Sequence, residues 1–364
     1  MKKGFLLLGC VVVIAITATA VIYRFQKEKP LPVGVIAWLA SGAVVGSSEL
    51  NAGDLFLEEH PNSLIRIFPV DDQWNPVMTR PSVEEAMGNG VRFFVTTHPS
   101  KCAVAMMSLF EEPRSLAIVA AATSPALTGK DDYTLRIIAD AEHEQRSIAR
   151  YVNNMEGKRI LVLQDEGNLP YTDPAFKSFS AELEALGKWE IVHLKLMVSN
   201  FNPDELTPIM KEHYDALFIL AGSYQAAIGN IAQLFHHLHP DAPILLTPWA
   251  RSSAILDNAG PAISKIILPS QYPSRHNDSA LDNYFRRFQA RFGYEPHSMT
   301  IGVRQALELL DSAFSQGHRT PEDVKKYLLS VKAHKTSLGA ISFDQFGDVV
   351  QPFYFIVDLE RELK

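Results

Sequence analysis

Small hydroxyl side chains follow two mainly apolar runs in the first third of the chain. The runs Val91–Val95 and Leu116–Ala120 have the composition of buried strands. Ligands bind at the carboxyl ends of parallel strands in open α/β sheets, so the two following loops should form one polar cup. Hydroxyls and free backbone N–H groups suit a carboxylate. The hydroxyl residues are Thr96, Thr97, Ser100, Thr123 and Ser124.

Ser100 also has a purely structural interpretation. Serine and threonine after a strand often serve as N-caps of the next helix, and Ser100 precedes a helical pattern at Ala103–Phe110. The two uses are compatible, because a helix N-terminus also binds anions. Two hydroxyl loops at neighbouring strand ends favour a binding site over a cap alone.

The sequence lacks the motifs expected of an enzyme or a cofactor-binding protein. Residues 42–46, GAVVG, do not match the dinucleotide fingerprint, and neither a P-loop nor a G-x-S-x-G elbow occurs. His236, His237 and His239 fit a solvated helix end better than a metal site. Cys102 has no evident partner base and fits a small buried residue. We therefore predict no catalytic residue, no metal and no cofactor.

Length and charge bound the function further. The chain has 364 residues, 47% of them hydrophobic, which suggests two domains with substantial cores. Its net charge of -7 is opposite to that of a surface that follows nucleic-acid phosphates, so we predict no nucleic-acid partner.

The N-terminus predicts export. Lys2 and Lys3 precede an uncharged apolar run from Gly4 to Tyr23, as in a signal peptide or a signal anchor. Cleavage after Ala18-Thr19-Ala20 and an uncleaved membrane anchor are both open, and a lipoprotein-like cleavage at Cys10 is a third, less favoured alternative. Each places the body of the protein in the periplasm or on the outer face of the cytoplasmic membrane.

The rest of the chain alternates strand and helix patterns. This alternation predicts an α/β fold with parallel sheets, and a second series that starts near Arg159 predicts two doubly wound, Rossmann-like lobes. At the end of the chain, residues 339–343 and 352–359 have the pattern of a β-hairpin, with a turn at residues 345–348.

These residues carry a family likeness from about Pro32 to Leu359. The chain resembles the type I periplasmic substrate-binding proteins of ABC transporters, in particular the leucine/isoleucine/valine-binding proteins. The run Ala121–Thr128, AATSPALT, is the most specific marker. The other markers are Asp71-Asp72 with Asn75-Pro76, Phe94–Ser100, Arg136 with Gln145, Asp165 with Tyr171, Ala221–Tyr224, Thr247–Trp249 and Phe343–Asp348.

The resemblance implies two lobes joined by three crossings, with a ligand cleft between them. Residues 1–31 would be the signal peptide or membrane anchor with its tether. Lobe one would comprise residues 32–142 and 272–337, and lobe two residues 143–271 and 338–360.

The same resemblance implies a set of ligand-binding residues. Ser100 and Thr123 match the positions that hold the ligand's carboxylate, and Ala121 matches the carbonyl that takes its ammonium. Glu142 lies near a position where the family often has an acid. The remaining candidates are Ser41, Tyr171, Ser223, Tyr224 and Trp249.

The departure at Thr247–Ala250 matters most for the ligand, because an acid that often pairs with the ammonium is missing there. The ligand would then be a small, amino-acid-like carboxylate or amide that is not itself an α-amino acid, or an aromatic acid that stacks on Trp249 and Tyr224. A cleft that no longer binds this class of ligand is a further alternative. We expect a solute-binding protein, not an enzyme, that delivers this small molecule to the membrane permease of an ABC transporter. The alternative is a membrane-anchored sensor that binds a ligand without a transport role.

Overall fold

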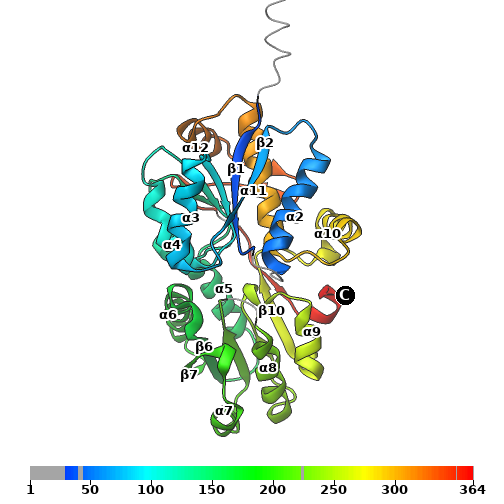
Figure 1. Cartoon of the computed structure of the whole chain (residues 1–364). Coiled ribbons are helices and arrows are strands. Elements are labelled where there is room, and N and C mark those ends of the chain that lie inside the picture. Colours follow the sequence, from blue (N-terminus) through cyan, green and yellow to red (C-terminus); the bar gives the residue numbers. More distant parts are fainter. Residues whose placement is uncertain (1–28, 40–43, 223–224, 350, 364) are drawn as a thin grey trace, which may run out of the picture.

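The computed structural model describes residues 29–39, 44–222, 225–349 and 351–363, which form two α/β lobes stacked end to end (Figure 1). Both lobes have a mainly parallel sheet with helices packed on its faces, so the predicted fold class is confirmed. No helix in these ranges is long and apolar enough to cross a membrane. The N-terminal apolar segment, Ser41, Ser223 and Tyr224 lie outside the described residues.

The first lobe is built on a parallel sheet with the strand order β2-β1-β3-β4-β5. Its strands are β1 (Leu31–Ala37), β2 (Ile65–Asp71), β3 (Phe93–Thr96), β4 (Leu116–Val119) and β5 (Thr134–Arg136). Its helices are α2 (Val44–Glu59), α3 (Pro76–Gly88), α4 (Ser100–Met106), α10 (Ser279–Phe292), α11 (Met299–Ser315) and α12 (Pro321–Ser330).

The second lobe has a sheet with the order β13-β10-β9-β8-β6-β7, in which only β13 runs antiparallel. Its strands are β6 (Arg159–Asp165), β7 (Glu190–Leu196), β8 (Ala216–Leu220), β9 (Ile244–Leu245), β10 (Ile266–Ser270) and β13 (Tyr354–Ile356). Its helices are α5 (Ala141–Asn153), α6 (Leu169–Leu186), α7 (Pro203–Met210), α8 (Ala226–Leu238), α9 (Ala254–Ala259) and α13 (Leu359–Leu363).

Short 3-10 turns complete the described elements. They are η1 (Met107–Phe110), η2 (Pro125–Leu127), η3 (Glu166–Asn168), η4 (Val198–Asn200), η5 (Pro248–Ala250), η6 (Gly260–Lys265) and η7 (Arg275–Asn277). Several of these turns follow the carboxyl ends of strands, which is where they can shape a ligand cleft.

The central strands could be predicted from apolar runs in the sequence because both faces of these strands are buried. The residues of β4 and β8 are all buried, as are those of β1 from Val33 onward. Gly34 in β1 serves close packing, because a Cβ there would lie 2.6 Å from the Phe94 ring. The two lobes thus have separate cores on separate sheets.

The C-terminal hairpin prediction is wrong in its pairing. Gly339–Ile341 (β12) pairs with His334–Thr336 (β11), whereas β13 pairs with β10 in the second lobe. The predicted turn does exist, since the Asp344 carboxylate accepts hydrogen bonds from the backbone N–H groups of residues 346–348. The partner of β13 lies far upstream in the chain, where a local hairpin pattern could not identify it, whereas β12 forms its hairpin with the strand directly before it.

The chain passes between the lobes after β5, after β10 and between β12 and β13. Ile341 and Val349 pack in the core of the first lobe. The sequence had assigned residues from 338 onward to the second lobe, so we propose that the third crossing instead follows Val349. The other lobe limits at 142/143 and 271/272 stay predictions.

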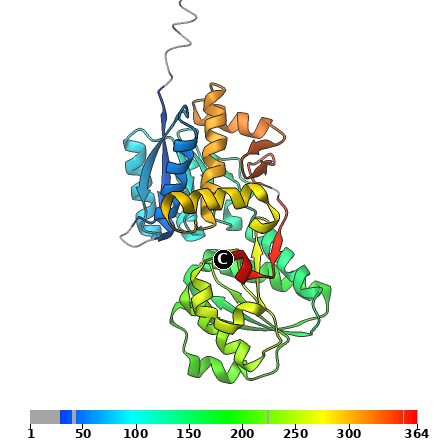
Figure 2. The same ribbon diagram turned by 90° about the vertical axis from the view of Figure 1, so that its right-hand side faces the viewer.

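The lobes also touch each other directly. One buried cluster joins Ala121, Ile138 and Met299 of the first lobe to Tyr171 and Trp249 of the second. Figure 2 shows the C-terminal helix α13 at this junction.

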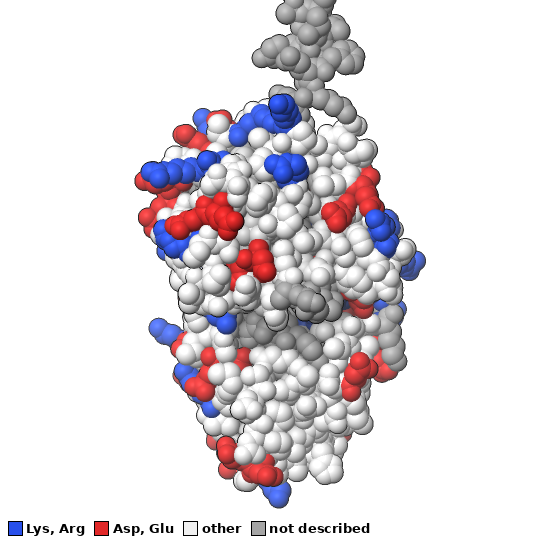
Figure 3. Space-filling view, in the orientation of Figure 1, with Lys and Arg blue, Asp and Glu red and all other residues white. Residues whose placement is uncertain are grey.

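On the face shown in Figure 3, charged side chains of both signs are interspersed over both lobes.

Candidate ligand site between the lobes

A small cavity lies at the junction of the lobes, where the carboxyl ends of the strands meet. The first lobe contributes residues from the loops after β2, β3 and β4, and the second contributes residues after β6, β8 and β9. This is the place where ligands bind in open α/β sheets. The lining residues are Trp74, Thr97, His98, Pro99, Ser100, Ala121, Thr123, Asn168, Tyr171, Gly222, Trp249 and Met299.

Five of the predicted ligand residues come together in this cavity: Ser100, Ala121, Thr123, Tyr171 and Trp249. Ser100 is the first residue of α4, and the cap position is Pro99, which makes no side-chain cap hydrogen bond. The Ser100 hydroxyl instead accepts a hydrogen bond of 3.2 Å from the backbone N–H of Ser124. It therefore ties the two hydroxyl loops together, as their neighbouring strands require.

The second lobe presents aromatic rings to the hydroxyls. Tyr171, near the start of α6, and Trp249, in η5, meet edge to face with ring centroids 6.4 Å apart. Both side chains are buried. Edge-to-face pairs of this kind hold each other in place, so the rings form a rigid apolar wall.

Trp74 adds a third ring, from the first lobe, and the sequence analysis did not identify it. It stands in a turn after β2 in which Gln73 and Trp74 have φ angles of 54° and 49°. Such left-handed backbone at residues other than glycine costs about 1–3 kcal/mol each and persists only where neighbouring groups hold it. The Asp71 carboxylate accepts from the Gln73 N–H, and Asp72 accepts from the Trp74 N–H. The Asp71-Asp72 pair thus positions the ring.

Asp72 is fully buried and holds the His98 side chain of the cavity wall in place by a hydrogen bond. Its Oδ2 accepts hydrogen bonds from Thr79 Oγ1 at 2.9 Å and from His98 Nδ1 at 2.7 Å. Burial alone would raise the pKa of this carboxyl, but hydrogen bonds from His98, the Trp74 N–H and Thr79 lower it below its ordinary value. Asp72 therefore stays ionised and orients His98 toward the cavity.

Cys102 approaches this pair, and the three side chains place one ligand atom each within 4.8 Å. Asp72 and His98 already bond to each other, and burial raises the pKa of the Cys102 thiol to about 12. A neutral buried thiol is a poor metal ligand, because metals bind the thiolate. We therefore assign the cluster to packing and hydrogen bonding.

Glu142 does not reach the cavity. Its side chain is 46% exposed and forms an ion pair with Arg146 one turn along α5. The buried acid on this helix is Glu144, whose carboxylate accepts hydrogen bonds from the Tyr171 hydroxyl at 2.5 Å and from Gln145 at 2.8 Å. Burial raises the pKa of Glu144 to about 7. The helical spacing of the buried residues Ala141, Gln145 and Ile148 could have identified Glu144 as the inward-facing acid.

Asn168 and Gly222 also line the cavity and were not among the predicted ligand residues. Both follow strands of the second lobe, so the strand-end rule applied to that lobe would have found them. Gly222 permits close approach, because a Cβ there would lie 2.6 Å from the Asn168 amide nitrogen.

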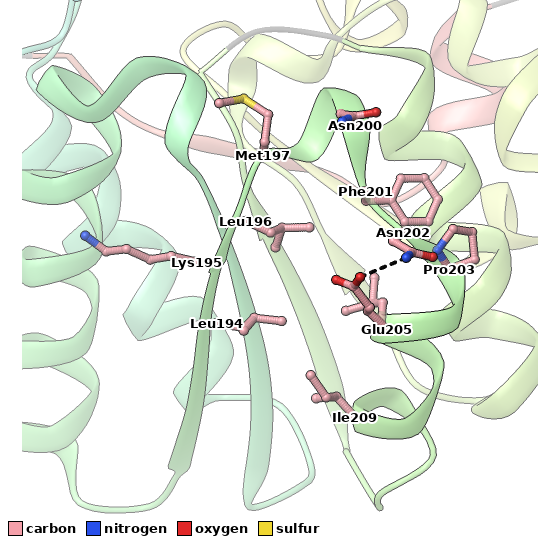
Figure 4. A pocket seen from close by; sticks show the side chains of 11 residues that line it. Leu194, Lys195, Leu196, Met197, Asn200, Phe201, Asn202, Pro203, Glu205 and Ile209 are labelled. Carbon is pink, nitrogen blue, oxygen red and sulfur yellow. Dashed lines mark hydrogen bonds between the residues drawn. The ribbon is translucent and has the colours of Figure 1, made fainter.

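A larger open groove lies elsewhere, along the edge strand β7 and the start of α7. Figure 4 shows that β7 supplies Leu194, Leu196 and the neighbouring Met197 to one side, while Phe201 and Ile209 face them. It contains none of the predicted ligand residues and no convergent polar groups beyond one Asn202–Glu205 hydrogen bond. The small cavity between the lobes is therefore the candidate site.

The chain has the architecture of the two-lobe solute-binding proteins. It has two lobes, three crossings between them and a polar cavity where the strand ends of the lobes face each other. Residues 31–358 match the periplasmic binding protein family, and the chain belongs to that family. Its members are the substrate-binding proteins of ABC transporters, so this chain is a binding protein rather than an enzyme.

Similar proteins are known at low identity. The Leu/Ile/Val-binding protein BraC3 of Rhizobium johnstonii is 23% identical over 308 residues, which cover 80% of this chain and 79% of that protein. The Leu/Ile/Val-binding protein homolog 1 of Brucella abortus is 22% identical over 343 residues, covering 89% and 86%. These proteins span most of the chain described here.

Solved structures show the same fold. The leucine-binding protein LivK of Thermotoga maritima superposes with a TM-score of 0.79 at 17% identity, covering 89% of this chain and 94% of that one. A solute-binding protein of an ABC transporter from Rhodopseudomonas palustris, in complex with 3,4-dihydroxybenzoic acid, has a TM-score of 0.77 at 20% identity, covering 90% and 93%. At such identities the likeness concerns the fold, and the ligand has to be argued from the cavity.

Proposed function

We propose that this protein captures a small aromatic carboxylate between its lobes and presents it to the membrane permease of an ABC transporter. One observation carries the proposal: hydroxyls from two adjacent strand ends and three aromatic rings line a single cavity. The ligand would bridge the lobes, with its charged end in the first and its ring between both.

The carboxylate end would bind Ser100 and Thr123. Each side chain is at most 3% exposed and each lines the cavity, so a hydrogen bond from either hydroxyl would form out of contact with bulk water. Hydrogen bonds to charged groups contribute about 1.5–3 kcal/mol each. No lysine or arginine is among the described lining residues, so neutral donors would carry the recognition.

The ring would pack among Trp74, Tyr171 and Trp249. Aromatic side chains supply large apolar contact areas and favour edge-to-face or offset stacking with another ring. No carboxylate is among the described lining residues, so an ammonium group would enter the cavity without a charged partner. The 3,4-dihydroxybenzoic acid complex of the Rhodopseudomonas protein supports an aromatic acid in this fold.

An α-amino acid is the second candidate. Ala121 lines the cavity at the position whose carbonyl takes the ammonium in the resembling family, and the curated relatives are named as Leu/Ile/Val-binding proteins. The two candidates differ in one respect that can be measured, namely whether removal of the amino group from the ligand weakens binding.

The experiment is isothermal titration calorimetry with benzoate, phenylacetate, benzamide, phenylalanine and leucine. We expect the aromatic carboxylates to bind, the amide to bind weakly, and the amino acids to bind least. Ser100→Ala and Thr123→Val should each reduce benzoate affinity roughly 10- to 100-fold, the effect of one lost hydrogen bond to a charge. Ser264→Ala, at an exposed site of the second lobe, is the matched control. Leucine binding without benzoate binding would select the amino-acid candidate, and equal affinity of all four proteins for benzoate would refute the site.

Export and delivery complete the proposal. Residues 1–31 would direct the chain across the cytoplasmic membrane as a signal peptide or remain as its anchor, and the mass of the mature protein separates the two. Uptake of radiolabelled ligand in cells with and without the gene tests the transport role. Unchanged uptake would favour an anchored sensor.

A further inference from the structure

Two nitrogen atoms in the cavity wall have no hydrogen-bond partner among the described residues. They are His98 Nε2 and Trp74 Nε1, and both atoms are buried. Both residues line the cavity between the lobes, and the His98 side chain is 0% exposed. Buried polar atoms are nearly always paired, so atoms of this kind in a ligand cavity indicate polar atoms on the ligand.

The two nitrogens are chemically complementary. His98 donates from Nδ1 to the Asp72 carboxylate, so in the neutral imidazole Nε2 is an acceptor. The Trp74 indole nitrogen can only donate. These two nitrogens therefore offer one acceptor and one donor, which is the complement of a hydroxyl group. Asn168 Oδ1, a further acceptor in the same wall, also lacks a partner among the described residues. A methyl group could satisfy neither atom, and a second carboxylate could satisfy only the donor.

Asp72 holds both partners in place. Its Oδ2 binds His98 Nδ1 at 2.7 Å and its Oδ1 accepts from the Trp74 backbone N–H at 3.0 Å. A single buried carboxylate thus fixes the imidazole tautomer and the turn that carries the indole. This arrangement is separate from the hydroxyls of Ser100 and Thr123, so it would contact a different part of the ligand.

We infer that the ligand is a hydroxy-substituted aromatic carboxylate, and that His98 and Trp74 are the residues that select for the hydroxyl. This inference rests on the proposed function, since it assumes that the carboxylate binds at Ser100 and Thr123. An unsubstituted ring would leave both nitrogens buried without partners. Sites built to bond a hydroxyl reject analogues that lack it far more strongly than apolar pockets reject an added one.

The test compares ligands that differ only at the substituent. Calorimetry on the full-length protein would measure benzoate, 3- and 4-hydroxybenzoate, and 3- and 4-methylbenzoate, whose methyl groups match the hydroxyl in size. We expect one hydroxybenzoate isomer to bind at least tenfold more tightly than its methyl counterpart. Equal affinities within each pair would overturn the inference while benzoate binding would still support the proposed function. If none of the five binds, the proposed function and the inference fail together.

Substitutions assign the effect to the residues. Trp74→Phe keeps an aromatic ring and removes the N–H, so the hydroxyl-to-methyl affinity ratio should fall about tenfold. Trp189→Phe is the matched control, because its buried indole nitrogen also lacks a partner among the described residues but lies in the core of the second lobe, outside the cavity. An unchanged ratio in a folded Trp74→Phe protein would overturn the inference. The wild-type ligand comparison decides it even if that variant does not fold.

Discussion

Glu144 should make the protein less stable as pH rises from 5 to 8, and Glu144→Gln should remove much of that dependence. The carboxyl is fully buried, and burial raises its pKa from 4.5 to about 7 despite the hydrogen bonds from Tyr171 and Gln145. In the unfolded chain it ionises near its ordinary pKa. Because the folded protein disfavours the ionised carboxylate, the free energy of unfolding falls when the pH rises above the ordinary pKa of the group.

The sign and magnitude follow from linkage. Below about pH 4.5 the group is protonated in both states and contributes no pH dependence. Between pH 4.5 and 7 the unfolded state releases the proton while the folded state keeps it, so the free energy of unfolding falls with pH. Above pH 7 both states are ionised and the loss is complete. Since each tenfold change in acidity is worth about 1.4 kcal/mol, the shift of Glu144 amounts to about 3 kcal/mol.

The assay is urea unfolding at pH 5, 6, 7 and 8 for the wild type, Glu144→Gln and Glu142→Gln. The glutamine oxygen of the first variant can still accept from Tyr171, so the variant should gain stability over the wild type by up to about 3 kcal/mol between pH 5 and 8. Glu142→Gln makes the same chemical change on the exposed side of the same helix and is the control. Burial also raises the pKa of Glu49, to about 8, so this group adds its own pH dependence to the stability. The contribution is equal in all three proteins and therefore cancels when their free energies of unfolding are compared. Parallel stability curves for the wild type and Glu144→Gln would refute the reasoning.

Two shorter predictions concern groups around the candidate site. Arg136 is buried and bonds Asp348 at 2.7 Å and the Ser124 carbonyl at 3.1 Å, so Arg136→Met should destabilise the protein by about 3–5 kcal/mol in urea unfolding, because it leaves a charge unpaired. The Cys102 thiol, buried and with its pKa raised to about 12, should resist iodoacetamide in the folded protein and react in urea, as mass spectrometry of a Cys10→Ser variant would show. Rapid alkylation of the folded variant would contradict the burial of Cys102.

The strands and the hydroxyl loops could be predicted because their determinants are local. An apolar run such as β8 is buried on both faces, and the run itself carries that information. Ser100 and Thr123 were found by the same logic, since each follows such a run directly. Their convergence in one cavity needed only the rule that parallel strands end at the same edge of a sheet.

The remaining site residues depend on geometry that single residues do not reveal. Trp74 reaches the cavity through two consecutive left-handed residues held by carboxylates, and no propensity predicts such a turn for Gln73 and Trp74. The choice of Glu142 over Glu144 failed by two positions on α5, which is enough to move a side chain from the buried face of a helix to the exposed face. β13 pairs with β10, which lies far upstream in the sequence, so local pattern could not give its partner, whereas β12 forms a short hairpin with β11 directly before it.

The position of Glu144 connects the candidate site with the segments that join the lobes. It lies on α5, directly after the first crossing, and bonds Tyr171 in the cavity wall. Its other oxygen accepts from Gln271 at the second crossing, and Gln271 in turn accepts at 2.9 Å from Gln351 at the third. A ligand that packs on Tyr171 therefore contacts a ring whose hydroxyl is bonded to the group shared by all three crossings. A movement of the lobes that breaks these hydrogen bonds would change the surroundings of this carboxyl. The pH dependence of stability and the strength of ligand binding should for this reason change together in Glu144→Gln, since both depend on one buried proton.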